Sequence, residues 1–252
     1  MNNLEILKRR HSVRSYTQDP LSPDIVKKLK AEITMTNTHQ QGIKFQLITD
    51  DPEPFKGFSK SYGIFENPRN YMAAVVDTAT PHIMERAGYF AQQFVIKAVE
   101  LGLGTCFVGG TYNEAVVKAQ LRAGEKILFL ILLGYPAGKS RKIASLMVNL
   151  VHRKKMNAAQ FFIPQQEYTE ALKSFPFLAD GIEGIACAPS ALNKRPTRVF
   201  IGEHRGQKVP CAKVDDSNLK NRIDLGIAKY NFNFATSTEC DWGNGSPLIL
   251  IE

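Results

Sequence analysis

The stretch from Glu85 to Leu101 is the most strongly patterned part of this 252-residue chain. Apolar side chains recur there at intervals of three and four, which places a wide apolar stripe on one face of an α-helix. Gly102 stands where helices commonly end in a left-handed residue. Residues 103–110 then form an apolar strand pattern that runs into Gly109-Gly110. A helix with a wide apolar face, followed at once by a strand, favours a fold that mixes helices with a sheet.

Helical and strand patterns alternate along the rest of the chain. Ser22 and Pro23 are typical of a helix N-cap and first turn, and the apolar spacing predicts a helix to residue 34, then a loop to Gly42. Asp215-Asp216-Ser217 is expected to cap a helix over 217–235. Further helices are expected over 113–121, 168–173 and 177–187, and strands over 43–48, 71–76, 127–133, 198–201 and 246–251.

The positive charge is unevenly distributed. The chain carries a net charge of +8, and residues 1–160 hold 22 Lys and Arg against 13 Asp and Glu. The cations cluster at residues 8–14 and 139–155. A polyanion partner would explain this pattern, and so would one phosphate held from two sides. Nucleic acid is the less favoured partner, because neither cluster is interleaved with aromatic residues.

Several classes of protein are not indicated by the sequence. No apolar run reaches the roughly 18 residues of a membrane span, and no secretory h-region is visible at the N-terminus. The four cysteines are scattered without a CxxC pair, which favours reduced thiols over a metal site. We therefore expect a cytoplasmic protein with no membrane partner and no metal. The cysteines are Cys106, Cys187, Cys211 and Cys240.

The first basic cluster reads Lys-Arg-Arg-His-Ser-Val-Arg over residues 8–14. Guanidiniums present planar forks of donors that match phosphate oxygens, and a serine hydroxyl fits between them. A solvated basic patch is the alternative interpretation of any such run. Here the run lies where a short helix passes into a loop, which gives it a fixed location. His11 could contact a phosphate or make a structural hydrogen bond, and the sequence leaves both open.

Three segments together resemble the nitroreductase family of FMN-dependent oxidoreductases. The first is Arg10-His11-Ser12-x-Arg14. The second is GYFAQQFVIKAVELGLGTCFVGG over residues 88–110, followed by the strand end Leu-Gly-Tyr-Pro at 133–136. The third is the loop Pro189-Ser190-x-x-Asn193-x-x-Pro196. The loop departs from the family pattern at Arg195, where Gln is common, and at Thr197, where Trp is common.

The resemblance implies an α+β nitroreductase-like fold, a central mixed or antiparallel sheet flanked by helices, and a bound FMN. It implies that the flavin phosphate is held near the N-terminal cluster, that a main-chain N–H at the double glycine reaches flavin N5, and that the Pro-Ser loop touches the ring and ribityl chain. The cofactor-binding residues expected on this basis are Arg10, His11, Ser12, Arg14, Gly109, Gly110, Arg153, Lys155, Pro189, Ser190, Ala191 and Asn193.

The family segments are distributed unusually along the chain. The phosphate segment occurs only in residues 1–160 and the Pro-Ser loop only in residues 161–252, while helices 85–101 and 217–235 form a weak internal repeat. This arrangement resembles the TM nitroreductase subgroup, interpreted as a duplicated and fused subunit with internal pseudo-twofold symmetry and one flavin between its halves. A monomer acting as a pseudo-dimer is expected, and a homodimer stays open.

The activity implied by the resemblance is transfer of hydride from NAD(P)H through FMN to an electron-poor acceptor, such as a nitroaromatic or a quinone. No catalytic side chain is assigned, because the chemistry is mostly the cofactor's. Neither GxGxxG nor GxxxxGK[ST] occurs, so a separate nucleotide-binding domain lacks its main signature. The alternative is a flavin-binding or flavin-sensing protein without enzymatic activity; a basic nucleic-acid-binding protein is less favoured.

Overall fold

The computed structural model describes residues 2–57, 63–138 and 156–250. The chain separates into two compact units. Unit 1 comprises Met1–Arg9, Met84–Gln93 and Arg153–Glu252, and unit 2 comprises Arg10–Ile83 and Phe94–His152. Helix α4 (Ile83–Glu100) is continuous and contributes residues to both units. Leu101 is its C-cap, and the next residue, Gly102, has a φ of +80°, which confirms the expected left-handed position.

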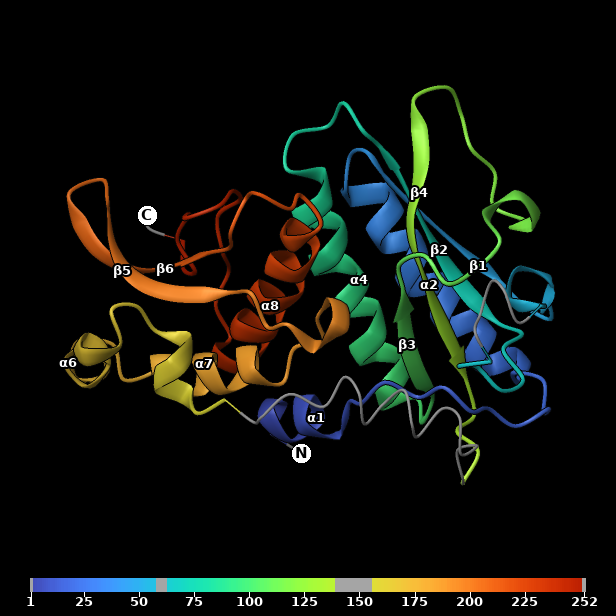
Figure 1. Cartoon of the computed structure of the whole chain (residues 1–252), viewed down its shortest axis with the longest axis horizontal. Helices are drawn as coiled ribbons and strands as arrows, with labels where there is room; N and C mark the ends of the chain where they lie inside the picture. The colour runs from blue at the N-terminus through green and yellow to red at the C-terminus, as the bar shows by residue number, and fades with distance from the viewer. Residues whose placement is uncertain (1, 58–62, 139–155, 251–252) are drawn as a thin grey trace. The chain divides into compact units, whose positions relative to one another are not determined.

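Unit 2 contains a four-stranded antiparallel sheet in the order β1-β2-β4-β3 (Figure 1). Its second strand is buried along almost its whole length, as expected for a strand with neighbours on both sides and both faces covered. One irregularity in the ladder falls between Ala74 and Val75. The strands are β1 (Ile43–Ile48), β2 (Tyr71–Asp77), β3 (Gly104–Val108) and β4 (Glu125–Gly134).

Helix α2 (Pro23–His39) lies against this sheet (Figure 1). Ser22 caps it as expected, since its side chain accepts a hydrogen bond from the Ile25 N–H at 3.3 Å. The expected loop from residue 34 is wrong, because the helix continues to residue 39. Asn37 exchanges two hydrogen bonds with the backbone of Phe45 in β1, at 2.7 and 2.9 Å, and this tertiary contact holds the last turn of the helix.

The expected helix over residues 113–121 is also wrong. Only a short 3₁₀ turn forms there, at Glu114–Val116. The following backbone is held extended by side chains of the sheet: the Lys118 N–H donates to the Tyr71 hydroxyl at 3.3 Å, and the Gln120 N–H donates to Gln46 Oε1 at 2.9 Å. These long-range bonds satisfy backbone groups that a helix would otherwise pair internally.

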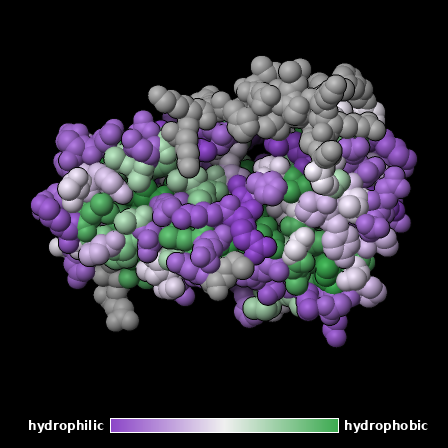
Figure 2. Space-filling view, turned by 90° about the horizontal axis from the view of Figure 1, so that it is seen from below, coloured by the Kyte–Doolittle hydropathy of each residue, from purple (hydrophilic) through white to green (hydrophobic). Residues whose placement is uncertain are grey.

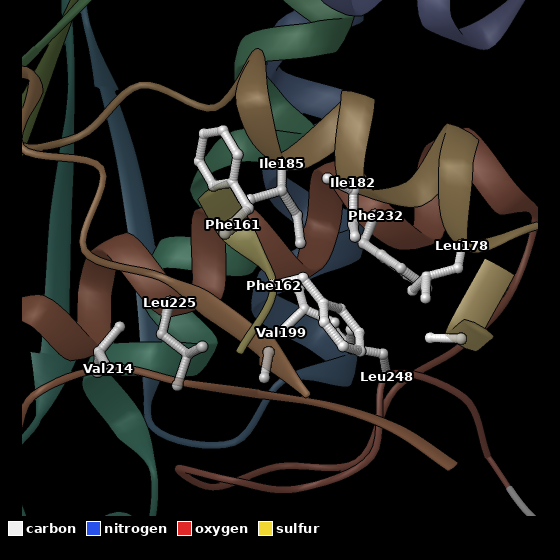
Figure 3. Packing of buried hydrophobic residues seen from close by; sticks show 13 residues of the cluster. Phe161, Phe162, Leu178, Ile182, Ile185, Val199, Val214, Leu225, Phe232 and Leu248 are labelled. Atoms are coloured by element: carbon white, nitrogen blue, oxygen red, sulfur yellow. The ribbon is translucent and has the colours of Figure 1, made fainter. Parts of the chain in front are cut away.

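Unit 1 packs helices against a two-stranded hairpin. Figure 3 shows side chains of α7 and Phe232 of α8 packed around Phe162 and Val199 in a continuous hydrophobic core. The first strand of the hairpin is longer than the expected 198–201, and β6 was not expected. The elements are α1 (Asn3–Arg9), α6 (Tyr168–Ser174), α7 (Leu178–Ala186), β5 (Arg198–His204), β6 (Gln207–Lys213) and α8 (Asn221–Thr236).

Two expectations for unit 1 need correction. Helix α8 begins at Asn221, because Asp215 bonds locally to the N–H and hydroxyl of Ser217 at 2.9 and 2.8 Å instead of capping a helix there. The final apolar segment is not a strand in its described part. It makes one isolated antiparallel bridge, between Pro247 and Cys211 of β6.

The crossing of α4 and α8 in unit 1 depends on two glycines. A Cβ on Gly226 would lie 1.8 Å from the Glu85 carbonyl oxygen, and one on Gly88 would lie 2.2 Å from the Ile223 carbonyl oxygen. Backbone therefore meets backbone at this crossing, and no side chain fits between the two helices there.

The expected combination of helices with an antiparallel sheet is confirmed. Among the described residues, no helix is both long and apolar enough to cross a membrane. The face drawn in Figure 2 carries widely distributed polar side chains with smaller hydrophobic patches between them.

Replacing Gly226 by alanine is expected to destabilise the protein by roughly 3 kcal/mol, because the new methyl group meets a backbone carbonyl that cannot move without parting two helices. The matched control is Gly138→Ala, since a Cβ at that exposed position meets no heavy atom within 4 Å. Urea unfolding measures both. Equal urea midpoints of unfolding for the two variants would show that α4 and α8 can move apart with little loss of stability.

Candidate functional site

The segment after α1 lies across one end of the sheet in unit 2. Ser12 forms a parallel bridge with Thr105 of β3, and the Val13 N–H donates to the Thr105 carbonyl at 2.9 Å. Further along, the Thr17 N–H donates to the Tyr135 carbonyl at 2.9 Å, just after β4. The N-terminal cationic segment is thus fixed by backbone hydrogen bonds to two neighbouring strands.

Glycines in the strands make this close packing feasible. A Cβ on Gly104 would lie 2.7 Å from the Val13 side chain, and one on Gly134 would lie 3.0 Å from the ring of Tyr16. Both glycines belong to the sequence segments that carried the family resemblance. Their physical role is to leave room for the segment that carries the cations.

Three of the expected phosphate ligands gather around one buried thiol. Burial raises the pKa of Cys106 on β3, while the charges of Arg14 and Arg10 and a hydrogen bond with Ser12 oppose that rise. Residues 10, 12 and 14 alternate along an extended segment, so they share one side of it. His11 is exposed. The structure therefore brings two guanidiniums and a hydroxyl to one place.

The double glycine follows β3 directly and is open. Gly109 and Gly110 are exposed, and a Cβ on either would meet no heavy atom within 4 Å. They lie at the end of the same strand that carries Cys106. The other expected phosphate ligands, Arg153 and Lys155, lie outside the described residues.

The remaining expected residues lie on one loop of unit 1. The short 3₁₀ turn Ala191–Asn193 carries the end of the Pro-Ser sequence. Pro189, Ser190 and Arg195 line a small pocket together with Asp224 of α8. Within the described part of the chain, no group of three His, Cys, Asp or Glu residues is arranged to hold a metal ion.

Sequence reasoning missed Asp224. Its side chain is 6 % exposed, and both carboxylate oxygens lie 3.2 Å from the Ala191 backbone nitrogen. Burial raises the pKa of Asp224 to about 6, although the Ala191 N–H and the charge of Lys194 oppose the rise. The sequence offered no signal for it, because an acidic residue in the first turn of a helix is ordinary.

Comparison with solved structures identifies the fold. A solved nitroreductase-like structure from Thermotoga maritima superposes with a TM-score of 0.58 at 18% identity, covering 93% of this chain and 83% of that one. An FMN-dependent nitroreductase from Clostridium difficile gives a TM-score of 0.39 at 15% identity, covering 60% of this chain and 98% of that one. The first of these similarities shows the nitroreductase fold.

The family follows from a direct match to the sequence. The family model described as "Putative TM nitroreductase" matches residues 2–236, so the chain belongs to this nitroreductase family, a family of oxidoreductases. A curated relative, the Cr(VI) reductase of Pseudomonas sp. (strain G-1), is 24% identical over 204 residues, which is 68% of this chain and 82% of that protein. The nitroreductase-like fold and the family expected from the sequence are therefore confirmed.

Substituting Asp224 by asparagine is expected to stabilise the protein at neutral pH. The ordinary pKa of this carboxyl is 3.8 and its folded value is about 6, so the folded state holds the proton more tightly and the free energy of unfolding falls as pH rises from about 4 to about 6. An asparagine side chain cannot ionise, so the variant should gain up to about 3 kcal/mol over the native chain at pH 7.5.

Urea unfolding of both proteins at pH 4.5 and pH 7.5 checks this expectation. The advantage of the variant should be larger at pH 7.5. A difference that is the same at both pH values would show that ionisation of Asp224 does not cost stability.

Proposed function

We propose that the chain is an FMN-dependent oxidoreductase that uses NAD(P)H to reduce an electron-poor acceptor, such as a nitroaromatic or a quinone. The observation that carries the proposal is the gathering of Arg10, Ser12 and Arg14 around Cys106 of β3, the strand that an open pair of glycines follows. Membership of a nitroreductase family supports it. The Cr(VI) reductase relative is also named for a reduction.

The residues of unit 2 suit a phosphate and a flat ring system. Two guanidiniums offer charge-assisted, fork-shaped hydrogen bonds to phosphate oxygens, and the Ser12 hydroxyl adds a donor between them. The segment that carries them is anchored to β3 and β4, so little conformational entropy is lost when an anion binds. Gly109 and Gly110 present backbone without a side chain, which lets a planar ligand approach an N–H closely.

The loop of unit 1 supplies a second group of candidate contacts. Pro189, Ser190 and Asn193 occupy the positions that the family resemblance assigns to the flavin ring and ribityl chain. We propose that FMN affinity depends on this loop. Arg153 and Lys155 remain proposed phosphate ligands.

A bound flavin would accept hydride from the reduced nicotinamide and pass reducing equivalents to the acceptor. The share of the protein is to bind the phosphate with Arg10 and Arg14, to orient the ring with the Gly109 N–H, and to leave one face open to both substrates in turn. No side chain needs to act as acid or base in this scheme, which is consistent with the lack of an assigned catalytic residue.

Replacing Arg10 and Arg14 together by glutamine is expected to lower FMN affinity at least about a hundredfold, because each charge-assisted phosphate bond contributes about 1.5–3 kcal/mol. The control is Lys27→Gln with Lys30→Gln, which removes two positive charges from the exposed face of α2. Flavin fluorescence titration measures both variants. Native affinity in the arginine variant would show that the phosphate lies elsewhere.

NADH or NADPH is expected to bleach the bound flavin without oxygen, and a nitroaromatic or quinone to restore its absorbance. Because both substrates are expected to use one open face, steady-state kinetics should be ping-pong, with parallel double-reciprocal plots. Stopped-flow absorbance and initial rates check this expectation. A chain that binds FMN tightly but is reduced by neither nicotinamide would be a flavin-binding protein without this activity.

A further inference from the structure

The loop after α7 has an unusual backbone. Leu192, Asn193 and Arg195 all have positive φ, between 50° and 52°. Residues other than glycine rarely adopt this region, and such conformations persist only where the surrounding structure holds them. Within four consecutive residues, three are therefore held in a sparsely populated conformation, so contacts with the rest of the unit must constrain this loop.

Hydrogen bonds of the loop's own side chains close it on itself. The Arg195 N–H donates to Ser190 Oγ at 2.9 Å, and Arg195 Nε donates to Asn193 Oδ1 at 3.2 Å. Arg198 donates to the carbonyls of Arg195 and Thr197, each at 2.8 Å. These bonds fix the shape of the loop, but they do not fix where its first turn lies on α8.

Asp224 fixes the position of this first turn on α8. Both of its oxygens face the Ala191 N–H at 3.2 Å, at the start of the turn that carries Leu192 and Asn193. The carboxylate is buried beside apolar Phe161 and Ile185, which line the same pocket. Burial raises the pKa of Asp224 to about 6 even though the Ala191 N–H and Lys194 oppose the rise, so these interactions do not offset the cost of burying the charge, and the ionised carboxylate is kept at the expense of stability.

We propose that Asp224 is a positioning residue for the flavin, whose carboxylate fixes Ala191 and thereby the backbone on which Pro189, Ser190 and Asn193 stand. This inference rests on the proposed function, since it assumes that FMN is the ligand of the loop. It assigns Asp224 no contact with the cofactor. The residue acts through the loop, and ionised Asp224 is the form that holds it.

The charged groups around Asp224 determine how its ionisation acts. On the loop, the positive charge of Lys194 favours the ionised form of Asp224, and Arg195 lines the same pocket. Residues of the 158–161 turn and of α7 present apolar groups to the pocket. At the α4 crossing, Glu85 is paired with Lys229. Lys194 is therefore the nearby charge that favours the ionised form.

The decisive variant is Asp224→Asn, because asparagine keeps one acceptor oxygen but has no charge. At pH 7.5 we expect FMN to bind about five- to tenfold more weakly, as a charge-assisted hydrogen bond becomes a neutral one. The same variant should be at least as stable as the native chain. Weaker binding together with greater stability cannot result from unfolding. The control is Asp180→Asn, an exposed aspartate in the first turn of α7.

The pH profile gives a second readout. The FMN phosphate also titrates near pH 6, so the informative quantity is the ratio of the two dissociation constants, in which the phosphate contribution cancels. This ratio should approach 1 as pH falls from 7.5 to 5, because native Asp224 then becomes neutral as well. A ratio that is constant over this range, or equal affinities at pH 7.5, would overturn the proposal.

A second variant tests the same hydrogen bond from the donor side. Ala191→Pro removes the N–H while leaving Asp224 in place, and the extended backbone of Ser190 (φ −147°, ψ 159°) is compatible with a following proline. Ala191→Pro should weaken FMN binding as Asp224→Asn does. The double variant should bind FMN little more weakly than either single variant, because both changes remove the same hydrogen bond. Fully additive losses would overturn the proposal. If the native chain itself fails to bind FMN, the proposed function fails first, and the two failures are thereby distinguished.

Discussion

A buried ion pair ties unit 1 together. Lys229 of α8 is 0 % exposed and Glu85 of α4 is 1 % exposed. The Lys229 ammonium lies within 3.0 Å of four oxygens: Glu85 Oε1, Ser246 Oγ, and the carbonyls of Asp241 and Gly243. Desolvating an unpaired ammonium costs several kcal/mol. Lys229 is therefore compatible with the core only when α4, α8 and the 241–246 segment are packed together, so that the acceptor oxygens surround its ammonium.

The pair and the glycine contacts specify the same register of α4 on α8. Gly226 allows α8 to approach the Glu85 carbonyl, and Lys229, three residues later, reaches the carboxylate of the same residue. The Gly243 N–H completes the arrangement by donating to Glu85 Oε2 at 3.0 Å. A shift of either helix by one residue would separate the charges inside an apolar core, so the pair favours a single packing of the unit over its near alternatives.

The sequence predicted those elements whose formation depends on local pattern. Strand β1 has the expected bounds, α4 lies within two residues of its expected range, and Ser22 caps α2 as expected. Some errors occurred where long-range bonds override local preference, as at Gln120, whose N–H bonds to the side chain of Gln46. The start of α8 was misplaced for a local reason, since Asp215 bonds to Ser217 instead of capping the helix. No periodicity in a sequence shows that Lys229 will meet Glu85, since such partners are set only when the helices pack.

The candidate site likewise contains residues that the sequence suggests and one that only the folded structure reveals. Arg10, Ser12 and Arg14 are proposed from the sequence because their residue types and spacing match the chemistry of a phosphate, and the structure adds that all three lie near Cys106. Asp224 could not, because an aspartate in the first turn of a helix is ordinary by itself. Its significance arises from burial and from the Ala191 N–H, both of which depend on how the loop folds over α8.

Helix α8 thus carries two buried charges with different physical consequences. Lys229 is surrounded by acceptors and bonded to a carboxylate, so its charge reinforces the packing of the unit. Asp224 is held by one backbone N–H, and burial raises its pKa to about 6, so its charge opposes folding at neutral pH. Groups with perturbed ionisation collect at functional sites because function can require an arrangement that stability alone would not favour. By this argument the first turn of α8, which bears Asp224, is the part of the helix where we propose that ligand binding acts, whereas Lys229 in the middle of the helix serves packing.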